Sequence, residues 1–173
     1  MRVFISLLLY LGLSAAIGYG FDFHPRLLIS LSKTAQGVFW GVLIASATWV
    51  LPQLTKRIPF LPREFKTPWK ESEDIIAKSL GEEVFLRGYL FQLLESASPV
   101  LGHLGNFLLS TALAFEQRKK WSTPLLKGLQ GTALALIFAS SRALWVVIVA
   151  RAVLEGGEFL LLKRRAQQQK RAL

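Results

Sequence analysis

The chain has 173 residues, 52% of them hydrophobic, with a mean hydropathy of +0.40, and the apolar residues form long runs rather than amphipathic stripes. This pattern excludes a soluble domain built on one core, and the absence of cysteine excludes disulfides and thiolate metal sites. The net charge is +10, but the basic residues cluster between the apolar runs, as in loops that face anionic lipid, so nucleic acid is not expected as a partner.

Six stretches are predicted as membrane-spanning helices, because each has about the 20 residues that a bilayer crossing needs. In chain order they are Val3–Phe21, Leu27–Leu54, Ser72–Ser96, Pro99–Phe115, Pro124–Ser140 and Ala143–Leu162. The first resembles a signal peptide, but no small-residue cleavage site followed by a soluble domain appears, so we expect a retained span. The predicted fold class is all-α, a polytopic membrane helical bundle of about six transmembrane helices.

The distribution of basic residues predicts the topology of this bundle. Three basic segments, 56–70, 118–127 and 163–171, fall on one side of the membrane if there are six spans with both termini on that side. The loops on the opposite side contain only Arg26, Lys33 and Arg142. Because loops rich in Lys and Arg face the cytoplasm, both termini are expected on the cytoplasmic-type side.

The chain divides into three predicted parts. Residues 1–70 contain two N-terminal transmembrane helices and a basic, proline-rich linker, residues 71–165 form a four-helix core, and residues 166–173 are a basic tail. In the fifth span, small residues recur at spacings of three to four, which predicts a face that a neighbouring helix can approach closely. These residues are Gly128, Gly131, Ala135 and Ala139.

Two adjacent glutamates, Glu82 and Glu83, lie inside the third predicted span. Ionisable groups at this depth are costly and commonly mark a functional site. Arg87 is four residues after Glu83 and Lys78 four before Glu82, so both carboxylates have a possible partner on the same helix. Two readings remain open: neutralised ion pairs that hold helices together, or a pair of carboxylates that activates water.

The motif Glu82-Glu83-x-x-x-Arg87, followed by Gly88-Tyr89-Leu90-Phe91, resembles the first motif of the CPBP (Abi, CAAX-protease-like) intramembrane protease family. The resemblance extends over roughly residues 72–162. It implies a helical membrane fold and, in active members, endoprotease activity in which the motif glutamate activates the attacking water. Two later histidines, and an asparagine one turn after the second, complete the family's site.

The chain departs from that pattern at three positions. Lys119 stands at the first histidine position, Arg151 at the second and Glu155 at the asparagine position. Arginine stays protonated and accepts no hydrogen bond, so it replaces neither a metal ligand nor a proton-exchanging imidazole. The two histidines of the chain, His24 and His103, are not placed like the family's ligands.

We therefore expect a pseudoprotease, with Arg87 orienting a carboxylate and with Glu82, Glu83, Arg87, Arg151 and Glu155 forming a buried ion network. We expect no metal, and no cofactor-binding residue is identified. The expected role is an accessory, assembly or stabilising subunit of a membrane complex, with membrane lipids and other membrane subunits as partners, in a bacterial inner membrane or thylakoid-type membrane. The alternative is an active intramembrane endopeptidase that uses Glu82 and Glu83 to activate water; a small transporter or channel is a weaker possibility.

Overall fold

A computed structural model describes residues 12–16, 18–20, 26, 28–54, 80–117 and 122–171. This part of the chain is helical and contains no strand, which confirms the all-α prediction. The helices are α2 (Leu31–Leu54), the π-helix η1 (Val84–Leu90), α4 (Phe91–Ala97), α5 (Pro99–Gln117), α6 (Ser122–Ser141) and α7 (Leu144–Arg171). Residues 12–16, 18–20 and 80–83 are also helical.

The six predicted membrane spans correspond only in part to these helices. None of the helices in the described ranges combines the length and the apolar character of a membrane-crossing segment. Most of the first predicted span, the linker between α2 and residue 80, and Lys119 lie outside the described residues. Helix α7 ends later than predicted, because it continues through most of the basic tail to Arg171.

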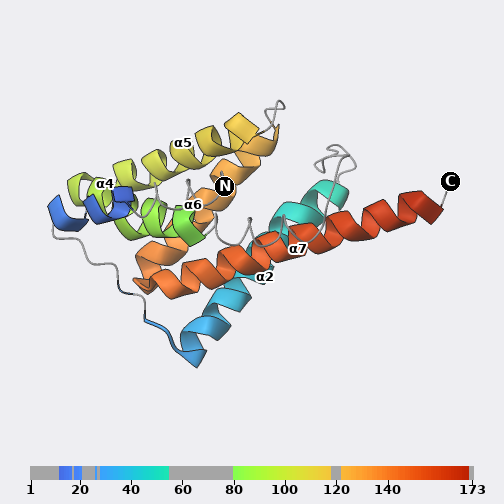
Figure 1. The fold of residues 1–173 in the computed structure, drawn as a ribbon, viewed down its shortest axis with the longest axis horizontal. Coiled ribbons are helices and arrows are strands. Elements are labelled where there is room, and N and C mark those ends of the chain that lie inside the picture. The colour runs from blue at the N-terminus through green and yellow to red at the C-terminus, as the bar shows by residue number, and fades with distance from the viewer. Residues whose placement is uncertain are drawn as a thin grey trace.

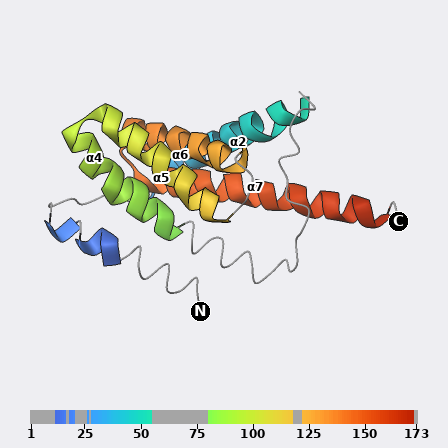
Figure 2. The ribbon, with the colours of Figure 1, turned by 90° about the horizontal axis from the view of Figure 1, so that it is seen from above.

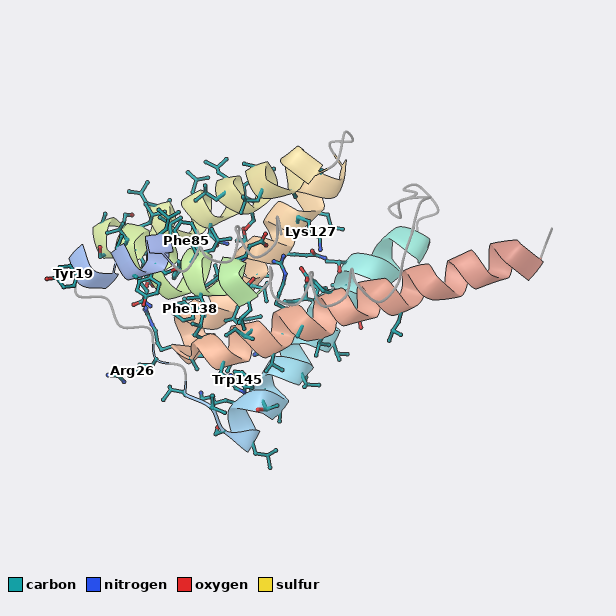
Figure 3. All side chains as sticks on the ribbon, viewed as in Figure 1. Tyr19, Arg26, Phe85, Lys127, Phe138 and Trp145 are labelled. Atoms are coloured by element: carbon teal, nitrogen blue, oxygen red, sulfur yellow. The ribbon has the colours of Figure 1, made fainter. Side chains whose placement is uncertain are left out.

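Helices α2 and α7 cross each other at close range (Figure 1). A Cβ atom on Gly37 would lie 2.7 Å from the carbonyl oxygen of Val146, and one on Gly41 would lie 2.7 Å from that of Ala150. Glycine at these two positions, four residues apart, therefore lets the two backbones touch. At the start of α7, the indole Nε1 of Trp145 donates a 2.9 Å hydrogen bond to Thr34 Oγ1 of α2 (Figure 3).

A second group of helices, α4, α5 and α6, packs side by side (Figure 2). Gly128 and Gly131 of α6 face α5, where added methyl groups would overlap Thr111 Oγ1 and Ser110 Oγ. Ala135 on the same helix is fully buried, and Ala139 packs against the core. The predicted small-residue face of α6 is thus confirmed.

A tight turn joins α6 to α7, as expected from the short separation of the last two predicted spans. Arg142 in this turn has a φ of +48°, a left-handed conformation that costs free energy for a side chain with a Cβ. Its guanidinium bonds both carboxylate oxygens of Glu95 on α4, at 2.6 and 3.1 Å. The turn therefore ties α4 to the start of α7, which positions α7 against the segment that carries the glutamates.

The apolar core lies where α2, α6 and α7 meet α4. Its fully buried members include Phe91, Leu134, Val147 and Leu154. Phe138 is 2% exposed and packs edge-on against Phe91. Its side chain is part of the core (Figure 3).

Candidate functional site

The two glutamates lie at the point where the helix changes its geometry. Residues 80–83 are α-helical, and from Val84 to Leu90 the chain follows the wider π-helix η1 before α4 continues in the same direction. The amide of Phe91 accordingly donates to the carbonyl of Leu86, five residues earlier. Short π-helical segments occur often at functional sites, because they shift side chains relative to a regular helix.

Glu83 and Arg87 form the centre of the cluster. Arg87 Nη1 lies 2.7 Å from Glu83 Oε1, and neither side chain is more than 1% exposed. The predicted pairing across four residues is therefore present, despite the π-helical backbone. Arg87 also donates from Nη2 to the carbonyl oxygen of Gly131 at 3.2 Å, which fastens the pair to α6. The missing side chain of Gly131 leaves that carbonyl accessible to the guanidinium.

Arg151 of α7 joins this pair to two further carboxylates. Its guanidinium lies 3.2 Å from Glu82 Oε2, 3.3 Å from Glu83 Oε1 and 2.5 Å from Glu155 Oε1. Arg151 is 12% exposed and its three partners are 14% exposed or less. All five residues of the expected ion network are thus in contact, and the network links η1, α6 and α7.

The energetics of such a cluster depend on complete pairing. Charged hydrogen bonds at these distances are strong, but removing charges from water costs several kcal/mol for each ion. A buried pair is therefore roughly neutral for stability while it is intact, and about 3–5 kcal/mol is lost when one partner is removed. Glu83 Oε2 and Arg87 Nε have no hydrogen-bond partner among the described residues.

Other residues singled out in the sequence are not brought into this cluster by the described part of the chain. Lys119, Lys78 and His24 lie outside the described residues. His103 lies on α5 with its ring centroid 5.2 Å from that of Phe91, in an edge-on contact. Lys127, assigned from the sequence to a basic segment, is half-buried within α6.

Four polar residues near the cluster were not identified from the sequence. Gln130 is 1% exposed and donates a 3.3 Å bond to Thr48 Oγ1 on α2, while Asn106 and Ser110 of α5 are 2% and 8% exposed. A signal for them did exist, because polar side chains within long apolar runs are expected to face the bundle interior.

The side chains of the cluster do not suit a metal ion. A guanidinium lies between the three carboxylates and bonds to each of them, and a guanidinium has no lone pair with which to bind a metal. Within the described ranges, no group of three or more histidine, aspartate or glutamate side chains is arranged to hold a metal. What this arrangement does provide is a cross-link between three helices.

The described part of the chain is an all-helical protein with a buried glutamate–arginine cluster at the start of a π-helix. In a comparison with protein-family models, residues 74–156 match the type II CAAX prenyl endopeptidase Rce1-like family. This match confirms, for that segment, the family resemblance seen in the sequence. Searches of curated proteins and of solved structures gave no significant match.

Proposed function

We propose that the chain is a multi-pass integral membrane protein of the Rce1-like family that no longer cleaves peptides. In this proposal it acts as an accessory, assembly or stabilising subunit of a membrane complex. The observation that carries the proposal is the position of Arg151, whose guanidinium contacts Glu82, Glu83 and Glu155 together. The cluster would then preserve the packing of the family fold after loss of its chemistry, without a metal or other cofactor.

Arginine at this position opposes hydrolysis for a chemical reason. A carboxylate that activates water must accept a proton from it during the reaction, and a guanidinium held at 2.5–3.3 Å favours the ionised form of the carboxylate and so opposes this proton transfer. The guanidinium itself neither takes up nor gives off a proton near neutral pH. Both properties favour a structural role for Glu82 and Glu83.

The distribution of polar and apolar side chains supports a membrane location. The interior contains Glu83, Arg87 and Gln130, while large apolar residues on the outward faces of α2, α5 and α6 are 36–87% exposed. Those residues are Leu31, Val38, Phe39, Val42, Leu43, Val100, Leu101, Leu104, Leu108, Leu109, Leu125, Leu129 and Leu136. Apolar surface of this extent suits lipid or partner helices. A bacterial inner membrane or a thylakoid-type membrane is the proposed location.

An assay of peptide cleavage tests the proposed loss of activity. Purified protein in lipid vesicles is incubated with a prenylated CAAX peptide and with a transmembrane peptide, and products are measured by mass spectrometry. We expect no cleavage above that of the Glu82→Gln and Glu83→Gln variants. Cleavage by the native chain that either variant abolishes would establish the alternative, an active intramembrane endopeptidase.

One observation favours that alternative. Glu83 Oε2 has no hydrogen-bond partner among the described residues, so one carboxylate oxygen is left to accept a hydrogen bond from water. The assay above therefore includes both glutamate variants, because loss of cleavage in Glu83→Gln alone would assign the reaction to this oxygen.

The subunit role is tested separately. The tagged chain, expressed at its native level, is cross-linked in membranes and its neighbours are identified by mass spectrometry. We expect reproducible cross-links to other integral membrane proteins through the outward faces of α2 and α5. A chain that migrates alone at its own mass after cross-linking would contradict the subunit role and leave the activity assay unaffected.

A further inference from the structure

Unpartnered polar atoms gather along one interface of the molecule. Seven buried side-chain nitrogen and oxygen atoms have no hydrogen-bond partner within the described ranges. Six of the seven belong to Glu83 and Arg87 on the η1 side and to His103, Asn106 and Ser110 on α5. Isolated atoms of this kind are scattered in most proteins, whereas here they share one interface.

The three α5 residues form a continuous row. His103, Asn106 and Ser110 are spaced three and four residues apart, so their side chains lie on one face of the helix at successive turns. Asn106 contributes both amide atoms, Nδ2 and Oδ1, and its side chain is almost completely buried. We call these three residues the α5 polar row.

The two ends of this row lie beside residues of α4 and α6 that border the ion cluster. At one end, the His103 ring meets Phe91, and a methyl group on neighbouring Gly102 would lie 3.2 Å from the Phe91 ring. At the other end, a methyl group on Gly131 would overlap Ser110 Oγ and lie 3.2 Å from Arg87 Nη2. The Ser110 hydroxyl and the Arg87 guanidinium thus lie close to the same point. One water molecule that forms two hydrogen bonds spans about 5.5 Å, which is enough to bridge the two groups.

The chemistry of these atoms suits water. The amide, the hydroxyl and the imidazole offer both donors and acceptors, while Arg87 Nε only donates and Glu83 Oε2, when ionised, only accepts. A water molecule donates and accepts and makes about three hydrogen bonds in a protein interior, so it can satisfy every member of this mixed set. Side chains one helical turn apart and fixed by packing do not satisfy one another directly in this structure.

We propose that the α5 polar row binds a chain of ordered water molecules that runs between η1–α4 and α5, from Glu83 Oε2 and Arg87 Nε to His103 Nδ1. The waters supply the hydrogen bonds that the ion cluster lacks from its own side chains. They thereby hydrate a buried glutamate–arginine pair from the side of α5, independently of any peptide cleavage.

A structure determined at about 2 Å resolution tests this directly. We expect at least one ordered water within hydrogen-bond distance of Asn106 and a second that bridges Ser110 Oγ to the Arg87 guanidinium. Direct side-chain bonds among these residues, a dry interface, or a molecule other than water at these atoms would overturn the proposal.

Hydroxyl-radical labelling tests it in lipid vesicles. Radicals generated from bound water modify nearby side chains, so Phe91 should be labelled although it is 0% exposed. In Asn106→Leu, which fills the interface with an apolar side chain of similar size, labelling of Phe91 should fall several-fold, and equal labelling in the two proteins would contradict the proposal. Leu154, equally buried on α7, serves as the unlabelled internal control.

The melting temperatures of two variants give an independent answer. If water fills the row, Asn106→Leu and the smaller change Ser110→Ala expel it and leave the remaining polar atoms unpartnered, so both variants should melt at lower temperature. If the row is dry, each substitution removes an unpartnered buried group and should raise the melting temperature. A rise in both variants would overturn the proposal.

Discussion

Arg151 is the residue on which the cluster depends most. It bonds glutamates from two segments that are about 70 residues apart in the chain, and the adjacent pair Glu83–Arg87 is anchored separately through Gly131. Without Arg151, the cluster would contain three carboxylates and one guanidinium, that of Arg87. The chain contains a second inter-helix arginine–glutamate pair, Arg142–Glu95, which serves as a natural comparison because its arginine side chain is 60% exposed.

Replacing Arg151 by methionine should therefore destabilise the protein strongly. We expect a loss of about 3–5 kcal/mol, because the variant leaves buried carboxylates without their cation. The measurement is thermal or denaturant unfolding of the purified protein in detergent. Arg142→Met is the matched control, and we expect it to cost less than about 1 kcal/mol, as exposed ion pairs do. Equal losses in the two variants would show that the burial of Arg151 does not matter.

The sequence predicted some of the contacts between individual residues of the site. The spacing of four residues was enough to predict the pairs Glu83–Arg87 and Arg151–Glu155. The contact between Arg151 and Glu82 joins distant segments, and it was expected only because the family resemblance placed their helices together. The bond from Arg87 to the Gly131 carbonyl could not be predicted, since it depends on the register between two helices and on the π-helical turn, which has no sequence signature.

Glycines determine how closely the helices approach one another. Gly37 and Gly41 bring α2 against α7, Gly128 and Gly131 bring α6 against α5, and Gly102 brings α5 to within van der Waals contact of α4. The spacing of small residues predicted the α6 face, and Gly37 and Gly41 on α2 are also four residues apart. This Gly-x-x-x-Gly pattern is visible in the sequence and is typical of helices that pack closely.

Adding one methyl group at Gly41 should separate α2 from α7. The new Cβ would lie 2.7 Å from both the Ala150 carbonyl oxygen and Val153 Cβ, and a backbone atom cannot move aside as a flexible side chain does. We expect Gly41→Ala to destabilise the protein by about 1–3 kcal/mol, as overpacking does. Unfolding in detergent measures the change.

Gly156→Ala is the control for that substitution. Nothing lies within 4 Å of a Cβ built at Gly156, and the residue is also within a helix, α7. Alanine there should be neutral or stabilise by about 0.5–1 kcal/mol through its higher helix propensity. If Gly41→Ala were equally harmless, close backbone contact between α2 and α7 would not contribute to stability.

In the described part of the molecule, buried polar side chains lie beside the apolar core, and many large apolar side chains are exposed. Charged and amide side chains are buried at the junction of η1, α5, α6 and α7, while leucines on α5 and α6 point outward. The sequence predicted the all-helical architecture from its long apolar runs, but it placed the end of the last helix near residue 162. The helix continues to Arg171 because the tail, although basic, contains no glycine or proline that would stop it.

The proposed topology has a direct test, because the chain contains no cysteine. Single cysteines are introduced at Arg142, in the turn before α7, and at Gln168, near its end. In sealed vesicles, a membrane-impermeant maleimide should label only one of the two, since a helix of 28 residues is about 42 Å long and the sites lie at its opposite ends. Labelling of both from the same side would contradict a membrane crossing by α7.

The close packing of α2 on α7 has a consequence for the order of events during synthesis. Gly37 and Gly41 leave the ribosome about a hundred residues before the α7 residues that cover them. At typical elongation rates the α2 surface waits about 5–20 s for its partner. During that interval its glycine face is open to other small-residue helices, so a nascent chain that stalls between α2 and α7 would be prone to pair with the wrong neighbour.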